Sequence, residues 1–268
     1  MGEHGEGTFE NGGATIFEQW WRPDGEPRAV VAICHGYAEH GGRYAQVAAD
    51  LNAAGFAVEA LDLRGHGRSS GERVTVSDYE EWIGDLAEFV ERVRGRNPGK
   101  KVFLLGHSMG GGVSTAYVLS RKPALDGVIL SGAGLLGPRP APPPEGTPPA
   151  APQPLPAYTI SRDPAVVQAY ENDPLVYRGP RPANMAAVSK PAYEMVQREM
   201  DTFAYPLLLI HGTEDLLVAA KGSEILHERA ASTDKTLKLY PGLYHEVLNE
   251  PERDQVIGDV AAWLGQRS

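Results

Sequence analysis

Short apolar runs of strand length alternate along this chain with longer segments whose apolar residues recur at helical spacing. Most of the runs are β-branched or aliphatic throughout, which is typical of strands buried on both faces. Strands that alternate with helices predict an α/β fold with a mostly parallel, doubly wound central sheet. The expected strands are residues 28–36, 56–62, 101–105, 126–132, 205–212 and 235–242, and the expected helices are 43–55, 77–96, 223–232 and 251–264, with one more helix beginning after residue 108.

Two further predictions concern how single elements begin or pair. Residues 14–21, ATIFEQWW, alternate in polarity and are expected to form an antiparallel strand at an edge of the sheet. The helix 77–96 has Ser77 as its expected N-cap, with Glu80 three residues later at the spacing of a capping box.

The alternation of strands and helices stops between residues 133 and 203. Residues 138–156 contain ten of the chain's 22 prolines, which excludes helix and interior strand there, and the segment after them is helical again without strands. We expect residues 1–132 and 204–268 to form the α/β core, and residues 133–203 to form an inserted lid over the carboxyl ends of the strands, where ligands bind in such sheets. The proline-rich tract 138–156 itself is expected to be a linker or a PxxP ligand for another protein.

Composition and charge restrict the classes of function. The chain has 268 residues, of which 42% are hydrophobic and 22% charged, and its net charge of -10 argues against binding nucleic acid and against electrostatic docking on anionic lipid. The N-terminal segment lacks the basic and apolar regions of a secretory signal, and no apolar run is as long as a membrane span. We therefore expect a cytoplasmic protein without stable membrane insertion. Its single cysteine, Cys34, allows no internal disulfide.

A candidate nucleophile lies where the run KVFLLG ends. Gly106, Ser108 and Gly110 form the pattern G-x-S-x-G between an expected strand and an expected helix, which is the pattern of a nucleophile elbow. In such an elbow a serine hydroxyl is exposed on a strained turn, and the flanking glycines let strand and helix approach closely. Ser108 is therefore the expected nucleophile.

A serine hydroxyl needs a histidine to take its proton and a carboxylate to orient that histidine. Asp215 follows the strand 205–212 and is the expected acid, with Glu214 as a competitor in the same loop. His245 lies in a loop just before the last helix, and it follows the acid as the chain order of α/β-hydrolases requires. His35, His66, His107 and His211 also lie near strand ends and could be mistaken for the base.

The oxyanion of an acyl-transfer reaction needs two hydrogen-bond donors. One is expected to be the backbone N–H of Met109, directly after the nucleophile, and the other an N–H of the loop after the strand 28–36, with Tyr37 as the best candidate.

Six motifs extend these observations over most of the chain: HGYAEHGGRY (35–44), ALDLRGHGRSSGER (60–73), GHSMGGG (106–112), SRDPAVVQAYENDPLVY (161–177), HGTEDLLV (211–218) and PGLYHEVLNEPER (241–253). Together they resemble the monoacylglycerol lipases of the α/β-hydrolase superfamily, in their bacterial form. The resemblance implies an α/β-hydrolase fold and a serine hydrolase that cleaves monoacylglycerol, a small lipid, to glycerol and fatty acid without metal or cofactor. It implies that Ser108, Asp215 and His245 are catalytic and that Tyr37 and Met109 form the oxyanion hole.

The resemblance also implies that Arg43, His107 and Tyr170 line the polar end of the site, which takes the glycerol hydroxyls, and that Glu39 and His40 shape the neighbouring loop. The family's lids usually carry an apolar helix that touches lipid, and here the proline-rich tract takes its place. We expect at most a transient lipid contact through a small apolar rim formed by Leu135, Leu136, Leu155, Tyr158 and Ile160.

Two alternatives remain open at this point. One is a lysophospholipase or a general carboxylesterase for short to medium acyl chains, because fold and triad do not select the leaving group. The other is a binding or scaffold protein without catalysis that uses the proline-rich tract as a ligand.

Overall fold

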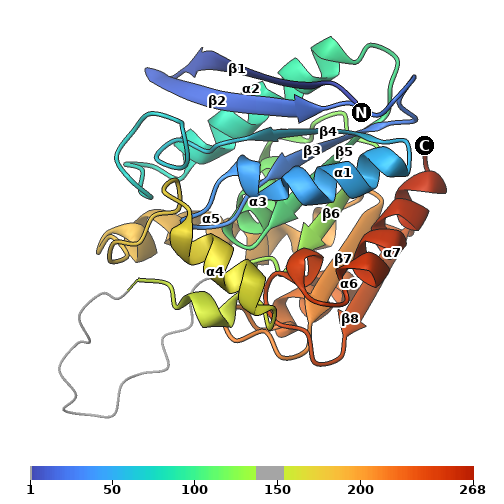
Figure 1. The fold of residues 1–268 in the computed structure, drawn as a ribbon. Coiled ribbons are helices and arrows are strands. Elements are labelled where there is room, and N and C mark those ends of the chain that lie inside the picture. The colour runs from blue at the N-terminus through green and yellow to red at the C-terminus, as the bar shows by residue number, and fades with distance from the viewer. Residues whose placement is uncertain (1, 137–153) are drawn as a thin grey trace.

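The computed structural model of the chain describes residues 2–136 and 154–268. Its centre is an eight-stranded sheet in the order β1-β2-β4-β3-β5-β6-β7-β8, in which β1 and β2 run antiparallel and the six strands from β4 to β8 run parallel (Figure 1). The strands are β1 (His4–Asn11), β2 (Ala14–Trp21), β3 (Val30–Cys34), β4 (Ala57–Leu61), β5 (Val102–His107), β6 (Gly127–Ser131), β7 (Leu207–Gly212) and β8 (Lys235–Tyr240).

The first strand of this sheet was absent from the sequence-based prediction. β2 is antiparallel as expected, but it lies between β1 and β4, so the prediction that residues 14–21 form a sheet edge is wrong. β1 is the edge strand, and it pairs with β2 across a tight turn in which Gly12 and Gly13 both have positive φ, of 52° and 78°. The sequence HGEGTFEN hides this strand because it is polar and largely exposed, whereas the Gly-Gly turn is a recognisable hairpin signal.

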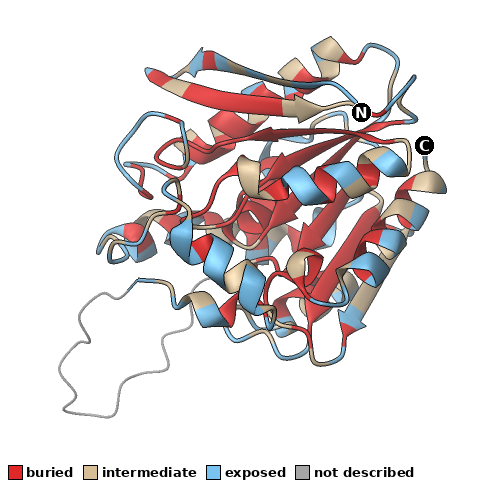
Figure 2. Cartoon of the chain, in the orientation of Figure 1, coloured by how far each residue is buried: buried red, intermediate tan, exposed pale blue. Residues whose placement is uncertain are grey.

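Helices cover both faces of the sheet (Figure 1). On one face α1 (Ala45–Ala53) and α7 (Arg253–Gly265) pack around Phe103 and Trp263. On the other face α2 (Glu80–Arg96), α3 (Met109–Arg121) and α6 (Lys221–Arg229) pack in a second cluster around Trp82. Five of the six parallel strands, β3 to β7, are buried along their whole length (Figure 2), which explains why they read as apolar runs, whereas β8 at the edge of the sheet is mostly half-buried.

The N-terminus of α2 differs from the predicted capping box. The helix begins at Glu80, and it is the carboxylate of Glu81, not that of Glu80, that accepts hydrogen bonds from the backbone N–H groups of Ser77 and Asp78, at 3.0 and 3.1 Å. Asp78 in turn accepts from the Glu80 N–H at 2.9 Å. The prediction that Glu80 completes a capping box with Ser77 is therefore wrong. The helix starts three residues after Ser77, and this start places the Glu81 side chain, not that of Glu80, next to the backbone N–H groups of Ser77 and Asp78.

Residues between β6 and β7 leave the sheet and return to it. Their described part contains α4 (Pro164–Asn172), α5 (Met185–Glu199) and the 3-10 turns Ala157–Thr159 and Met200–Thr202. Backbone hydrogen bonds join this segment to loops of the core: Tyr177 N–H donates to Ala38 O, and Glu246 N–H donates to Ile160 O, both at 2.8 Å. Most of the predicted proline-rich tract 138–156, namely residues 138–153, lies outside the described residues.

The predicted apolar rim is only partly correct. Leu135 and Ile160 are each 1% exposed and belong to packed clusters, so they cannot form a surface rim. Leu136 and Leu155 are half-buried, and Tyr158 is 68% exposed. No helix within residues 2–136 and 154–268 is long and apolar enough to span a bilayer.

Candidate active site

Ser108 lies at the sharp connection between β5 and α3. Its φ of 52° and ψ of -117° are unusual for a residue with a side chain, and this strain holds the hydroxyl clear of both elements. A Cβ at Gly110 would lie 2.2 Å from His35 O, and one at Gly106 would lie 2.5 Å from Ser114 Oγ. The two glycines are therefore required by the close approach of β3, β5 and α3 around the serine.

Three side chains form a hydrogen-bonded chain at this elbow. His245 Nε2 lies 2.8 Å from Ser108 Oγ, and His245 Nδ1 lies 2.7 Å from Asp215 Oδ2. The side chains of His245 and Asp215 are 4% and 1% exposed. Residues separated by 137 and 30 positions in the chain thus meet in the order that serine activation requires.

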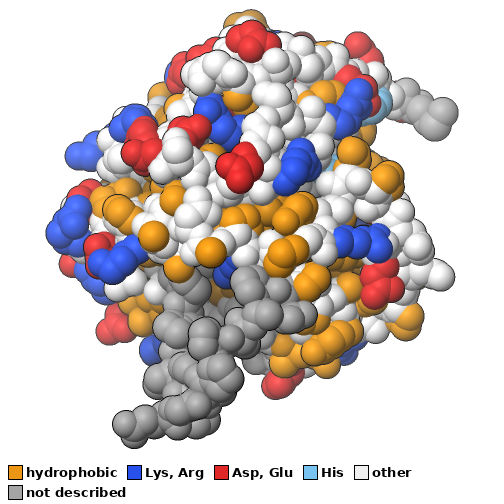
Figure 3. Space-filling model, turned by 90° about the vertical axis from the view of Figure 1, so that its left-hand side faces the viewer, with side chains coloured by type: hydrophobic (Ala, Val, Ile, Leu, Met, Phe, Trp, Pro, Cys, Tyr) orange, Lys and Arg blue, Asp and Glu red, His pale blue; other side chains and the backbone are white. Residues whose placement is uncertain are grey.

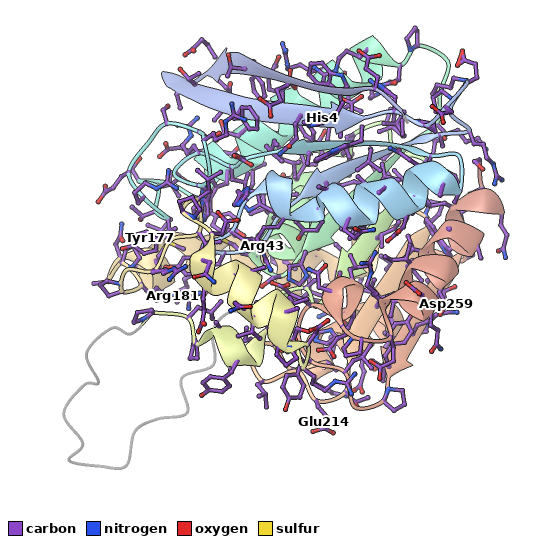
Figure 4. All side chains as sticks on the ribbon, in the orientation of Figure 1. His4, Arg43, Tyr177, Arg181, Glu214 and Asp259 are labelled. Atoms are coloured by element: carbon purple, nitrogen blue, oxygen red, sulfur yellow. The ribbon has the colours of Figure 1, made fainter. Side chains whose placement is uncertain are left out.

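The loop after β7 wraps around the Asp215 carboxylate. Oδ1 accepts hydrogen bonds from the N–H groups of Leu217 and Val218, both at 2.8 Å. Burial raises the pKa of this carboxyl, but hydrogen bonds from His211, His245 and Val218 outweigh it and hold the pKa well below its usual range. Glu214, the competing acid, is exposed and points outward at the edge of the molecule (Figure 4).

The other histidines near strand ends have different partners. His35 Nε2 accepts from Leu63 N–H at 2.9 Å and its Nδ1 donates to Gly36 O at 2.8 Å, so its ring joins two loops of the core. Burial, followed by the neighbouring His35, lowers the pKa of His66 to about 3. His211 contacts Asp215 Oδ2 at 3.1 Å, and sequence reasoning did not foresee this contact. Its position four residues before the acid was the only signal in the sequence.

The expected oxyanion donors flank Ser108. The N–H groups of Tyr37 and Met109 make no hydrogen bond that competes for them in the described part of the chain. The loop before Tyr37 is fixed by Glu39, whose Oε1 accepts from Gly36 N–H at 2.6 Å, and by Ala38, whose φ is 67°. A donor held by a strained loop is preorganised for a negative charge that develops during reaction.

Arg43, expected to meet the glycerol hydroxyls, is instead engaged by two buried carboxylates. Its Nη1 lies 2.6 Å from Glu39 Oε2 and 2.6 Å from Glu246 Oε1, and its Nη2 lies 2.8 Å from Glu246 Oε2. The guanidinium also lies over the ring of Tyr170 on α4, 4.8 Å from the ring centre, and Figure 4 shows Arg43 beside this helix. Arg43 thus joins the loop of Tyr37 to the loop of His245 and lies behind the wall of the cavity.

Two cavities meet at Ser108. The larger, of about 580 Å³, is lined mainly by apolar side chains such as Met109, Leu135, Leu136 and Met185. The smaller, of about 260 Å³, is lined by Glu39, His107, Tyr170, His245 and Glu246. Tyr37, Ser108, Arg181, Leu217 and Val218 line both cavities and form the neck between them.

The smaller cavity contains polar groups without protein partners. The hydroxyls of Tyr37 and Tyr170 are buried and make no hydrogen bond with any described residue. His107 Nδ1 donates to Ser131 O at 3.0 Å, so its Nε2 is left as an acceptor, and burial, followed by His245, lowers its pKa to about 4. Buried hydroxyls without partners are costly, which favours a hydroxylated ligand here. No group of three or more metal-ligating side chains is found in the described residues.

A model of the family described as serine aminopeptidase, S33, matches residues 25–252. The monoacylglycerol lipase of Mycolicibacterium smegmatis is 40% identical over 94% of this chain and 94% of that protein. The chain therefore belongs to the monoacylglycerol lipase family of α/β-hydrolases. As a member of that family it is a carboxylic ester hydrolase.

Further relatives agree with the monoacylglycerol lipase family. Human monoglyceride lipase is 34% identical over 96% of this chain and 88% of that protein. The crystal structure of Paleococcus ferrophilus monoacylglycerol lipase superimposes with a TM-score of 0.79, at 30% identity, over 94% of this chain and 99% of that one. The expected α/β-hydrolase fold and family are thereby confirmed.

Proposed function

We propose that the protein hydrolyses monoacylglycerols to glycerol and free fatty acid through an acyl-enzyme, with Ser108 as nucleophile, His245 as general base and acid, and Asp215 as the carboxylate that orients His245. The observation that carries this proposal is the hydrogen-bonded chain from Ser108 to Asp215 at the junction of a larger cavity with mainly apolar side chains and a smaller cavity beside the buried hydroxyls of Tyr37 and Tyr170. A substrate with a long apolar arm and a short hydroxylated arm fits that division.

The reaction proceeds in two halves. His245 Nε2 takes the proton of Ser108 Oγ as the oxygen attacks the ester carbonyl, and the N–H groups of Tyr37 and Met109 bind the oxyanion. His245 then protonates the leaving glycerol oxygen, which breaks the ester bond and leaves the acyl group on Ser108. Water enters, loses a proton to His245 and releases the fatty acid, after which Ser108 regains its proton.

The two arms of the substrate are assigned to the two cavities. The acyl chain lies in the larger cavity, between Leu135, Leu136 and Met185. The glycerol lies in the smaller one, where the Tyr37 and Tyr170 hydroxyls and His107 Nε2 supply hydrogen-bond partners. In this assignment Arg43 does not touch glycerol and instead holds Glu39 and Glu246 in the cavity wall.

Residues 133–203 act as the lid in this proposal, because α5 and the segment around Arg181 line the larger cavity above Ser108. Hydrophobic side chains gather in a band across the middle of the molecule on this side, with charged side chains above the band and at its ends (Figure 3). Tyr158 and Leu216 are the large hydrophobic side chains most exposed in the described residues, at 68% and 56%. This surface supports a transient lipid contact of a cytoplasmic enzyme.

One observation favours a second candidate, a lysophospholipase. Arg181 lines the neck beside Ser108 with its guanidinium 4.8 Å from the centre of the Tyr37 ring, and no carboxylate in residues 2–136 or 154–268 forms an ion pair with it. An arginine without a carboxylate partner is suited to bind a phosphate. Such a substrate would place its headgroup at the neck.

The test is hydrolysis of 1- and 2-monoacylglycerols of increasing chain length, compared with p-nitrophenyl esters, lysophosphatidylcholine and lysophosphatidate. We expect preference for monoacylglycerols and complete loss of turnover in Ser108→Ala. The matched control is Ser120→Ala on the same helix, an exposed serine whose Oγ bonds only to α3 carbonyls, and it should keep full activity. Equal turnover of all esters would reduce the proposal to a general carboxylesterase, and absence of turnover would favour the scaffold alternative.

Arg181→Gln separates the two candidate substrates within the same assay. If lysophospholipids are the substrates, this variant loses roughly tenfold or more in kcat/KM for lysophosphatidate, the value of a charged hydrogen bond. The kcat/KM for neutral monoacylglycerol should change little, because glycerol has no charge for Arg181 to bind.

A further inference from the structure

His211 is a fully buried histidine that the proposed reaction does not use. It is the second-last residue of β7, and its side chain is 0% exposed. Its Nδ1 lies 2.8 Å from Ser223 Oγ on α6, and its Nε2 lies 3.0 Å from Val218 O and 3.1 Å from Asp215 Oδ2. The ring therefore fills the space between α6 and the loop that carries the proposed catalytic acid.

The neighbours of the ring determine where its proton lies. Val218 O and the Asp215 carboxylate are both acceptors, so Nε2 carries the hydrogen. It donates this hydrogen to Val218 O and shares it with Asp215 Oδ2, which lies 3.1 Å away. Nδ1 then accepts a hydrogen bond from the Ser223 hydroxyl. In this tautomer the His211 ring contacts the same Asp215 oxygen that His245 contacts.

Asp215 Oδ2 thus has two imidazole donors, His245 at 2.7 Å and His211 at 3.1 Å. We propose that His211 is a positioning residue for the proposed catalytic acid. It orients the Asp215 carboxylate and partly neutralises its charge. The contact keeps Oδ2 within hydrogen-bond distance of His245 Nδ1 and limits how strongly Oδ2 attracts the Nδ1 proton. This inference rests on the proposed roles of Asp215 and His245.

Loss of the His211 donor has two consequences. The carboxylate is oriented less firmly, which lowers kcat because His245 spends less time aligned on Ser108. The charge on Oδ2 is also shared among fewer donors, so Oδ2 attracts the His245 Nδ1 proton more strongly and favours the protonated ring. The catalytic base must be free of a proton on Nε2 before the reaction, and a more stable protonated ring gives up that Nε2 proton only at higher pH, so the acid limb of the kcat/KM profile moves to higher pH.

The other titratable and charged groups around this pair remain unchanged in the variants that test it. His107 on β5 faces His245 with its ring centre 4.7 Å away, Glu246 follows His245 in the same loop, and Glu39 and Arg43 lie beyond His107. Ser223 on α6 is the polar side chain that contacts Nδ1 of the His211 ring. A change in the profile can therefore be attributed to the His211 contact.

Two substitutions separate the two edges of the ring. In His211→Gln the amide nitrogen reaches the place of Nε2 and still donates to Asp215, whereas in His211→Asn the shorter amide reaches only the place of Nδ1 and keeps the Ser223 contact. Ser223→Ala is the matched control, because it removes the hydrogen bond on the far edge and leaves the Asp215 contact in place.

The readouts are kcat and the pH profile of kcat/KM on a soluble p-nitrophenyl ester, with the unfolding temperature of each variant. We expect His211→Asn to lower kcat roughly tenfold, as loss of a hydrogen bond to a charged group does, with the acid limb moved to higher pH. His211→Gln and Ser223→Ala should keep the wild-type acid limb. An unmoved limb in His211→Asn, or the same movement in His211→Gln, would overturn the proposal.

Two further outcomes are covered by the same set of variants. If His211→Asn does not fold, His211→Gln decides alone, because a displaced acid limb in that folded variant contradicts the role assigned to Nε2. Failure of the proposed function is seen separately: Ser108→Ala would then retain turnover of the p-nitrophenyl ester, whatever the His211 variants do.

Discussion

At the residue scale, the site depends on charged side chains that are buried together. Glu39, Arg43 and Glu246 form one ion-pair cluster, with side chains 4%, 10% and 6% exposed. Burial alone would raise the pKa of Glu39, but Arg43, followed by His107 and other neighbours, lowers it to about 2. The Glu39 carboxylate also accepts a hydrogen bond from the Gly36 N–H. Its negative charge therefore strengthens a contact that fixes the loop carrying Tyr37.

The linkage predicts a pH-dependent stability. The pKa of Glu39 is lower in the folded chain, about 2, than its ordinary value of 4.5, so ionised Glu39 stabilises the fold above pH 4.5 and this contribution is lost as the pH falls toward 2. At pH 7 we expect Glu39→Gln to lower the free energy of unfolding by about 3 kcal/mol. The measurement is denaturant unfolding of both proteins across this pH range.

The control for this experiment is Glu26→Gln, because the Glu26 side chain is 82% exposed and its ion pair with Lys100 is a surface contact. Its effect should lie within about 0.5 kcal/mol at every pH. A stability difference between wild type and Glu39→Gln that stays constant down to pH 2 would contradict the linkage.

At the scale of single elements, the connection from β5 to α3 leaves no room for a side chain at Gly110. The helix begins directly after Ser108, and its first turn lies against the end of β3, where the carbonyl oxygens of Cys34 and His35 are 2.3 and 2.2 Å from the place of a Cβ at Gly110. Real Cβ atoms do not approach backbone oxygens so closely, so a side chain there must displace β3 or α3. Glycine at this position is a requirement of packing, since it does not have a positive φ.

This packing predicts opposite effects for two Gly→Ala substitutions in helices. Gly110→Ala should lower the free energy of unfolding by about 1–3 kcal/mol through overpacking and reduce kcat by shifting Ser108. Gly258→Ala, at an exposed position of α7 where nothing lies within 4 Å of the added Cβ, should raise it by about 0.5–1 kcal/mol. Thermal unfolding and p-nitrophenyl ester turnover are measured for both variants. A Gly110→Ala protein as stable and active as the wild type would contradict the prediction that the elbow has no space for a Cβ at this position.

At the scale of the whole molecule, charge and apolar surface act in opposite directions on lipid. The net charge of -10 repels an anionic bilayer, whereas exposed hydrophobic side chains such as Tyr158 and Leu216 favour contact with any lipid surface. An enzyme of this kind should therefore work on neutral surfaces and leave them easily.

The balance predicts a dependence on vesicle charge. Monoacylglycerol dispersed in phosphatidylcholine vesicles should be hydrolysed roughly two- to fivefold faster than in vesicles that also contain phosphatidylserine, and the difference should vanish as added salt screens the charge. Turnover of a water-soluble p-nitrophenyl ester is the control and should not depend on the vesicles. Faster hydrolysis in anionic vesicles would show that a local basic surface overrides the net charge.

The sequence determined the features that are local or ordered along the chain. Buried parallel strands read as apolar runs because both their faces are covered, so the five parallel strands β3 to β7 were predictable for this reason. The G-x-S-x-G pattern was informative for the same reason, because strand, turn and helix are consecutive in it. The order of Ser108, Asp215 and His245 then restricted the choice among eight histidines.

Tertiary structure decided which of several chemically similar groups meet, because that depends on distances between segments far apart in sequence. Asp215 rather than Glu214 faces His245, Arg43 is held by Glu39 and Glu246 instead of lining the cavity, and His211 lies against the acid. The edge strand β1 escaped prediction because Phe9 is the only buried residue among its eight, which is too little apolar pattern to mark a strand. The sequence by itself thus determined the sheet and the kind of chemistry, and packing in three dimensions decided which partner each charged group has.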